Sequence, residues 1–215
     1  MIPFPTSTSI GKRIPKELFY QNLTLTPELK RAFVEDVESI VWLYMLSPAT
    51  LNVTAGKSIQ QIDVVQVNLK RLDYHAALLE IIEKTIPRPL VFILKHQYQY
   101  QLLIHYKECT TQNSWKIIET YQTSWMSESD FSLEIKGISL DQVYEQFVLQ
   151  IAGNTLFKKE GTSLKETVIK TQEAVRIQKK IAELEKKMRN EKQFNIQLKI
   201  ASEIKSLKRE QEIRE

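Results

Sequence analysis

The C-terminal quarter of the chain contains no glycine and no proline, and this absence constrains the fold more than any other feature. Residues 163–215 are rich in Lys, Glu and Gln, which favour helix. Seven apolar residues recur there at helical spacing in two sets: Ile177, Ile181, Leu184 and Met188, then Ile200, Ile204 and Leu207. Such spacing places each set on one face of a helix. The segment is therefore predicted to be helical.

The two apolar sets do not share a heptad register. Continuing the first set by sevens reaches Asn195 and Ser202 instead of Ile200. Either one helix of roughly 80 Å contains a stutter, or the chain turns near residues 189–194 into an antiparallel hairpin, which we favour slightly. An isolated helix leaves its apolar face in water, so the seven residues need a sibling helix, the rest of the chain or a partner to cover them. We predict that they bind a partner.

The preceding residues show the alternation of a mixed domain. The apolar residues of segment 1–14 have no periodicity, so we predict an extended N-terminal arm there. We predict that residues 15–156 form an α+β body. Thr26 as N-cap and Pro27 behind it mark the clearest helix start. Helices are predicted at 27–38, 73–86 and 139–153, and strands at 40–46, 50–53, 61–69, 90–94, 101–106, 115–121 and 131–135. This order predicts a single mixed sheet with flanking helices, followed by a C-terminal helical hairpin or coiled coil over 163–215.

Charge divides the chain at the same place. Residues 157–215 hold sixteen Lys and Arg and ten Asp and Glu, a net charge of +6, whereas the remainder has a net charge of −2. The interleaved Glu residues are typical of a solvated, salt-bridged helical surface. Lysines on an exposed helix can also contact phosphates without reading sequence. Nucleic-acid binding through the tail is therefore an alternative, with Lys186, Lys187, Arg189 and Lys192 as its candidate residues.

Compartment signals are few. No apolar run approaches the roughly 20 residues that cross a bilayer, and the N-terminus lacks a signal-peptide pattern. Cys109 is the only cysteine, so no intrachain disulfide can form, and the three histidines are not spaced like metal ligands. We expect a soluble cytoplasmic protein that does not bind membranes.

The glycines argue against a nucleotide site. All five are isolated, whereas phosphate-binding loops need clustered glycines. Gly56-Lys57-Ser58 ends like a phosphate loop, but Leu51 stands where the first glycine of that motif belongs. We interpret this segment as a turn.

The predicted order of elements across residues 27–95 resembles the core of the PD-(D/E)xK nuclease fold: helix, three strands, helix, strand. Such enzymes hold a divalent metal through clustered carboxylates, because Mg²⁺ prefers oxygen ligands and activates water beside the scissile phosphate. Glu38, Asp63 and Lys70 are the residues that would serve here, although no carboxylate stands two places before a lysine in the third strand. A degenerate Mg²⁺-dependent nuclease is thus the enzymatic alternative. Otherwise no cofactor or metal is expected.

Three groups of unusual short sequence motifs occur along the chain. They are Phe4-Pro5 with Ile14-Pro15-Lys16 and Phe19-Tyr20, then Ser39-Ile40-Val41-Trp42 with Leu46-Ser47-Pro48-Ala49-Thr50-Leu51-Asn52, and last Glu191-Lys192-Gln193-Phe194-Asn195. In this order the chain resembles a bacterial family catalogued as domain of unknown function 4391. The resemblance implies gene neighbourhoods with helicases and DNA methyltransferases, the setting of restriction-like defence against phage. It supplies no catalytic residues.

These observations favour a non-catalytic accessory or scaffold subunit of a bacterial anti-phage defence or restriction-like DNA-processing assembly. The C-terminal helices would bind a protein partner: a helicase, a DNA methyltransferase or a second copy of this chain. Whether the protein is an enzyme stays open.

Overall fold

The computed structural model describes residues 4–22, 25–109, 115–156, 158–159 and 161–214. The chain divides into two compact units. The first unit, Met1–Thr155, is called the body. The second unit, Leu156–Glu215, contains the two C-terminal helices. The predicted fold class, a single mixed sheet with flanking helices followed by a helical hairpin, is confirmed.

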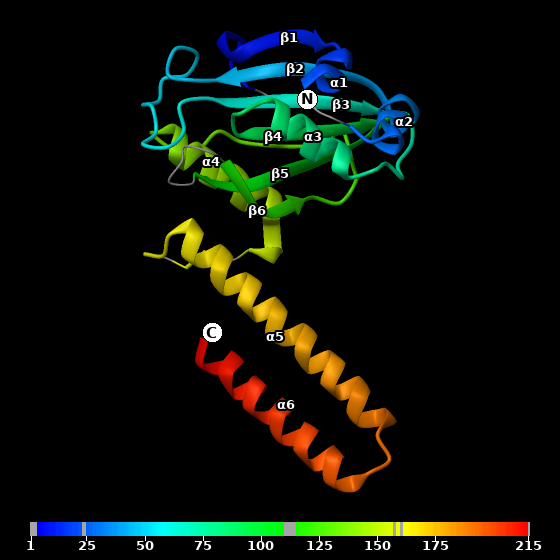
Figure 1. The fold of residues 1–215 in the computed structure, drawn as a ribbon. Coiled ribbons are helices and arrows are strands. Elements are labelled where there is room, and N and C mark those ends of the chain that lie inside the picture. Colours follow the sequence, from blue (N-terminus) through cyan, green and yellow to red (C-terminus); the bar gives the residue numbers. More distant parts are fainter. Residues whose placement is uncertain (1–3, 23–24, 110–114, 157, 160, 215) are drawn as a thin grey trace. The chain divides into compact units, whose positions relative to one another are not determined.

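The body is built on one mixed sheet (Figure 1). Its strands follow the path β1-β2-β3-β4-β5-β6, and β7 pairs with β5. Among the described pairings of named strands, only that of β3 with β4 is parallel, and α3 connects these two strands. The strands are β1 (Ser9–Ile14), β2 (Val37–Leu46), β3 (Ile62–Leu69), β4 (Leu90–His96), β5 (Gln99–Cys109), β6 (Trp115–Gln122) and β7 (Met126–Ser127).

Three helices pack on one face of this sheet: α1 (Glu17–Asn22), α2 (Pro27–Asp36) and α3 (Ala77–Thr85). Their buried apolar side chains form one core with alternate residues of β2 to β5: Phe19, Phe33, Ile40, Val65, Leu78, Ile82, Phe92 and Leu103. This core explains why the strands are apolar and β-branched, because such side chains pack well on a pleated surface.

The fourth helix, α4 (Leu140–Ala152), lies against the other face. Its Phe147 ring stacks on Phe4 at 5.9 Å, and Phe4 meets Tyr44 edge-on at 5.2 Å. Tyr44 pairs with Val64, whose side chain faces away from that of Val65. The sheet is therefore covered by helices on both faces.

The predicted cap of α2 is confirmed and Ser139 caps α4, but the helix predicted at 73–86 begins at Ala77, and its N-cap, Ala76, makes no side-chain hydrogen bond. The Thr26 hydroxyl accepts a hydrogen bond from the Leu29 amide at 3.3 Å, and Ser139 does the same for the Gln142 amide at 3.4 Å. Gly153 ends α4 with a φ of 52°, a conformation that glycine adopts without strain.

Two predicted strands are wrong. Residues 131–135 pair with no strand; the Gln150 side chain instead accepts from the Glu134 amide at 2.9 Å and donates to the Glu134 carbonyl at 2.8 Å. Residues 50–53 form a turn in which the amides of Thr50 and Leu51 both donate to the Ser47 carbonyl, and only Thr54 bridges to Ser139. In both segments, local hydrogen bonds replace the ladder that a strand needs.

The predicted N-terminal arm also differs from the structure. Residues 1–3 lie outside the described residues, and Thr6–Thr8 form a 3-10 turn. Ser9–Ile14 are extended, as predicted, but they pair antiparallel with β2 and form an edge of the sheet. In the described chain, only β2 and β3 lie between α2 and α3, so the predicted helix, three strands, helix order does not occur.

The second unit is a helical hairpin. Helix α5 (Leu164–Asn190) begins with a capping box made by Ser163 and Glu166, and α6 spans Phe194–Arg214. The Glu191 carboxylate accepts hydrogen bonds from the Lys192 and Gln193 amides at 2.8 and 2.9 Å. These bonds satisfy backbone donors in the turn, so the hairpin favoured above replaces the single long helix.

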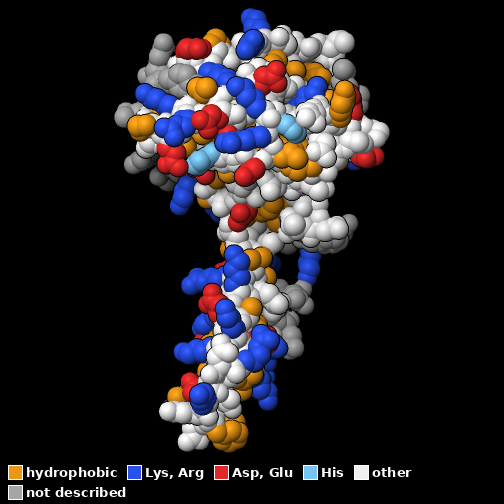
Figure 2. Space-filling model, turned by 90° about the vertical axis from the view of Figure 1, so that its right-hand side faces the viewer, with side chains coloured by type: hydrophobic (Ala, Val, Ile, Leu, Met, Phe, Trp, Pro, Cys, Tyr) orange, Lys and Arg blue, Asp and Glu red, His pale blue; other side chains and the backbone are white. Residues whose placement is uncertain are grey.

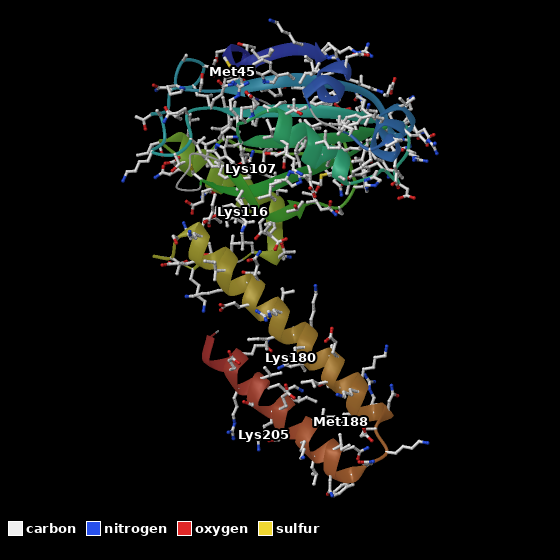
Figure 3. The ribbon with its side chains drawn as sticks, in the orientation of Figure 1. Met45, Lys107, Lys116, Lys180, Met188 and Lys205 are labelled. Atoms are coloured by element: carbon white, nitrogen blue, oxygen red, sulfur yellow. The ribbon has the colours of Figure 1, made fainter. Side chains whose placement is uncertain are left out.

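The interior of the hairpin consists of the seven predicted apolar residues and Ile196, which was not predicted. Four isoleucines are buried with at most 9% exposed, and four further side chains pack around them. Figure 3 shows Met188 between the two helices. The buried set is Ile177, Ile181, Ile200 and Ile204, and the surrounding set is Leu184, Met188, Ile196 and Leu207.

In the described part of the chain, no helix is both long and apolar enough to span a membrane.

Candidate functional site

The three predicted nuclease residues do not form one site. Asp63 pairs with Met45 in the antiparallel β2–β3 ladder, and Glu38 precedes Met45 by seven residues. At about 3.3 Å per residue, Glu38 and Asp63 are roughly 20 Å apart. Lys70 follows Leu69, the partner of Val37, so Lys70 lies at the Glu38 end. The fold thus brings together Glu38 and Lys70 and leaves Asp63 at the other end of the strands.

Lys70 binds a backbone carbonyl near the C-terminal end of α2. Its ammonium donates to the Val34 carbonyl at 2.8 Å, and the Lys16 ammonium donates to the carbonyls of Phe33, at 3.1 Å, and of Val37. The last carbonyls of a helix lack intrahelical partners and carry partial negative charge, so lysines stabilise them. Burial, and then the charges of Lys70 and Arg13, lower the pKa of Lys16.

Glu38 lines a small cavity beside this lysine. The cavity has a volume of about 340 Å³ and lies between the β1–α1 connection and the start of β2. Two cations and two carboxylates line it: Arg13, Lys16, Glu17 and Glu38. Because the two signs balance, the lining favours neither an anion nor a cation.

Asp63 is the buried partner of an ion pair with the half-exposed Arg88. Its carboxylate is 3% exposed and accepts from Arg88 Nε at 2.9 Å and from Gln61 Nε2 at 2.7 Å. The Arg88 guanidinium also lies 5.9 Å from the centre of the Trp42 ring. These contacts hold the loop between α3 and β4 against β3.

We predict an asymmetry between the two partners. Arg88→Ala leaves a buried carboxylate with Gln61 as its remaining side-chain donor and should lower the free energy of unfolding by about 2 kcal/mol. Asp63→Ala should cost about 1 kcal/mol, because the half-exposed Arg88 can turn to water. Urea denaturation of the two variants measures this, and a larger loss for Asp63→Ala would contradict it.

A second polar cluster lies deeper in the body. Glu83 of α3 contacts two residues of β5: His105 Nδ1 lies 3.1 Å from one carboxylate oxygen, and the Lys107 ammonium forms an ion pair with the other. All three side chains are 2–4% exposed. Figure 3 shows Lys107 within the body. We call Glu83, His105 and Lys107 the buried triad.

Further hydrogen bonds connect the buried triad to its surroundings. Lys107 Nζ donates to the Arg88 carbonyl at 2.8 Å, which links the triad to the Asp63–Arg88 pair. From the other face, the Tyr144 hydroxyl donates to the His105 carbonyl at 2.9 Å and accepts from the Lys107 amide at 3.1 Å. Burial raises the pKa of the Tyr144 phenol, so it stays protonated and can donate.

The buried triad has catalytic residue types but no access. A general base must come within hydrogen-bond reach of a substrate proton, and these side chains are almost fully covered by protein. We therefore interpret the triad as a structural network. Sequence analysis missed it, although a signal was present: His105 and Lys107 follow Leu103 at strand spacing, and Glu83 follows Leu79 at helical spacing.

The phosphate-loop-like segment already holds an anionic group. The amides of Lys57, Ser58 and Ile59 point at the Asp141 carboxylate, with distances of 2.7, 3.3 and 2.9 Å. Successive amides of this kind form an anion-binding concavity. Here Asp141 of α4 occupies it, so the predicted turn is confirmed as a structural joint between the loop and α4.

Gly56 permits this joint. A Cβ atom at this position would lie 2.1 Å from an Asp141 carboxylate oxygen and 2.8 Å from the Ile59 carbonyl oxygen. We predict that Gly56→Ala lowers the free energy of unfolding by about 2 kcal/mol, measured by urea denaturation. Lys57→Ala keeps the backbone donors and should stay within about 0.5 kcal/mol of wild type. Equal effects of the two variants would refute the steric explanation.

The structure also places the residues predicted in the tail. The seven predicted partner-binding residues contact one another inside the hairpin. The four predicted nucleic-acid residues are exposed near the α5–α6 turn: Lys186, Lys187, Arg189 and Lys192. Within the described ranges, no three His, Cys, Asp or Glu side chains are grouped to hold a metal ion.

Comparison with models of protein families shows to which family the chain belongs. The family model described as Domain of unknown function (DUF4391) matches residues 2–210. The chain belongs to the DUF4391 family. Neither the curated proteins nor the solved structures gave a significant match.

The DUF4391 match includes both units, so the hairpin is part of the family's architecture. The sequence motifs on which the resemblance rests lie at helix ends and turns of the fold. Lys16 contacts the end of α2, Thr50 closes the turn after β2 by donating to the Met45 carbonyl at 2.8 Å, and Glu191 closes the turn of the hairpin. The expected membership is confirmed, and the family's description leaves function open.

Proposed function

We propose that this DUF4391 protein is a non-catalytic accessory subunit of a bacterial anti-phage defence or restriction-like DNA-processing assembly, and that its hairpin binds the partner protein. The observation that carries the proposal is the hairpin itself. It forms a compact unit separate from the body, with an apolar core of its own. Its surface is crowded with Lys and Arg (Figure 2). Such an element fits a role in contacting another molecule.

The structure changes how this docking would work. Ile177, Ile181, Ile200 and Ile204 contact one another, so in the folded hairpin they cannot also serve as a partner's binding surface. The hairpin would instead bind as a folded unit, through its outer surface. The seven residues first predicted to bind the partner then act indirectly, by keeping the two helices together.

The body supports the same proposal. Its buried carboxylates are engaged by cations of the same chain: Asp63 by Arg88, Glu83 by Lys107 and Asp36 by Arg71. Groups held in this way position elements of a scaffold. We propose that the protein is cytoplasmic. The body would serve as a scaffold for the hairpin, and the hairpin would bind a helicase or a DNA methyltransferase.

Co-purification from the native host tests the proposal. The tagged full chain should retain a specific protein partner, identified by mass spectrometry, including after nuclease treatment. The doubly substituted Ile181→Asp/Ile200→Asp chain should lose it, because charges buried in the hairpin core separate the helices. Val34→Asp is the matched control, since Val34 is 58% exposed on α2.

The outcomes separate the alternatives. Loss of the partner from the core variant, with retention by Val34→Asp, is expected. Retention of the partner by both variants would overturn docking through the hairpin. Release by nuclease treatment would indicate nucleic-acid binding instead.

A further inference from the structure

One face of α6 is exposed and, within the described chain, makes no ion pair with a carboxylate. Residues at intervals of four, seven and four share this face, because 3.6 residues complete a helical turn. They are Phe194, Leu198, Lys205 and Arg209, which we call the outer face of α6, and all four are exposed. In Figure 3, Lys205 extends from the side of α6 away from α5.

The apolar half of the outer face lies next to the turn. Phe194 is 69% exposed and Leu198 is 53% exposed, one helical turn apart. A single exposed apolar residue is normal, but an aromatic and an aliphatic side chain spaced in this way form the anchor pair by which helices dock into apolar grooves. Ala201 and Ser202, which are small and exposed, continue the face toward Lys205.

The cationic half of the outer face differs from the flanks of the hairpin. On the flanks, Lys180 pairs with Glu203 at 2.7 Å and Lys208 pairs with Glu185 at 3.1 Å. Lys205 and Arg209 have no such carboxylate among the described residues. Their charges are therefore available to a second molecule.

We propose that the outer face of α6 docks into an apolar groove with an acidic rim on a partner protein. Phe194 and Leu198 would enter the groove, and Lys205 and Arg209 would pair with Asp or Glu at its edge. This inference rests on the proposed function and names its contact surface and the partner's chemistry. Complementary charge orients such a complex and excludes wrong partners.

Two other occupants fit the face less well. A second copy of this chain would bring two cationic faces together, and like charges facing each other are unfavourable. A nucleic acid would pair its phosphates with Lys205 and Arg209 and stack a base on Phe194, but it would leave Leu198, which has no polar or aromatic group, in water. The combination of aliphatic and cationic side chains favours a protein.

Site-specific photo-crosslinking in the native host tests this inference with the full chain. A benzophenone amino acid replaces Ser202 on the outer face, and in a control chain it replaces Lys179, an exposed residue of α5. The expected result is a crosslink from position 202, absent from position 179, to a protein whose crosslinked peptide lies beside Asp or Glu residues. In Lys205→Glu/Arg209→Glu the yield should fall roughly tenfold, because two attractive contacts become repulsive. Replacing the partner's acidic residues with Lys should restore it.

The remaining outcomes would overturn the inference. These are a crosslink to a second copy of the chain, a crosslink to nucleic acid, equal crosslinking from both positions, or no crosslink from position 202. If co-purification still depends on the hairpin core in these cases, the proposed function stands and only the assignment to the outer face fails. If co-purification is also independent of the hairpin, both fail.

Discussion

Glu83→Ala should lower the free energy of unfolding of the body by about 3–5 kcal/mol. The substitution leaves the Lys107 ammonium, which is 3% exposed, without its carboxylate partner. Among the described residues, that ammonium then keeps its hydrogen bond to the Arg88 carbonyl. Removing the counter-ion of a buried charge lowers the free energy of unfolding far more than removing that of an exposed charge, because water cannot replace the missing partner.

Urea denaturation followed by tryptophan fluorescence measures this effect in the body alone, since Trp42, Trp115 and Trp125 all belong to that unit. Glu80→Ala is the matched control on the same helix, because Glu80 forms an exposed pair with Lys84 and should cost less than about 1 kcal/mol. Adding Lys107→Met to Glu83→Ala should recover part of the loss. A cost for Glu83→Ala no larger than that of Glu80→Ala would show that the buried triad does not stabilise the body.

Ile200→Asp should unfold the hairpin without unfolding the body. Ile200 is 6% exposed and packs against the other isoleucines of the hairpin interior. Placing a carboxylate there should cost about 4 kcal/mol or more, because the surrounding side chains offer no partner. Two helices that depend on each other for burial would then lose structure together.

Amide hydrogen exchange across α5 and α6 measures the loss, and tryptophan fluorescence should stay that of a folded body. Leu198→Asp is the matched control, since it introduces the same charge two residues away at a half-exposed position. It should leave exchange in both helices close to wild type. Equal acceleration by the two variants, or none by Ile200→Asp, would show that the isoleucines are not the core of the hairpin.

The elements that sequence predicts correctly are those with strong local signals. The helix at residues 27–36 has its N-cap and proline, and α4 has Ser139 at its start and Gly153 at its end. The register break between the two apolar sets was compatible with a stutter or a turn and slightly favoured the hairpin, and the structure has the turn between α5 and α6. These signals act within a few residues, so tertiary packing does not override them.

The errors occur where distant residues decide the structure. Residues 131–135 have a strand-like alternation, but the Gln150 side chain of α4 takes the backbone hydrogen bonds that a neighbouring strand would use. Ser9–Ile14 form an edge strand only because β2 is available beside them. Periodicity reveals which side chains face inward but does not identify the group that pairs with the backbone.

The candidate site shows the same division. Apolar spacing identified the right seven residues of the hairpin, yet it could not distinguish a partner's surface from the helix that follows in the chain. The nuclease candidates failed because strand register, which sequence does not specify, separates Glu38 from Asp63. The buried triad was missed because ion pairs between α3 and β5 depend on the packing of two elements about 20 residues apart.

Hydrogen exchange of the full chain with and without its co-purified partner tests the central claim most directly, because it locates the partner on the molecule. The account predicts slower exchange at the turn and in α6, around residues 190–209, with unchanged exchange in the strands of the body. Protection confined to the body, with none in the hairpin, would contradict it.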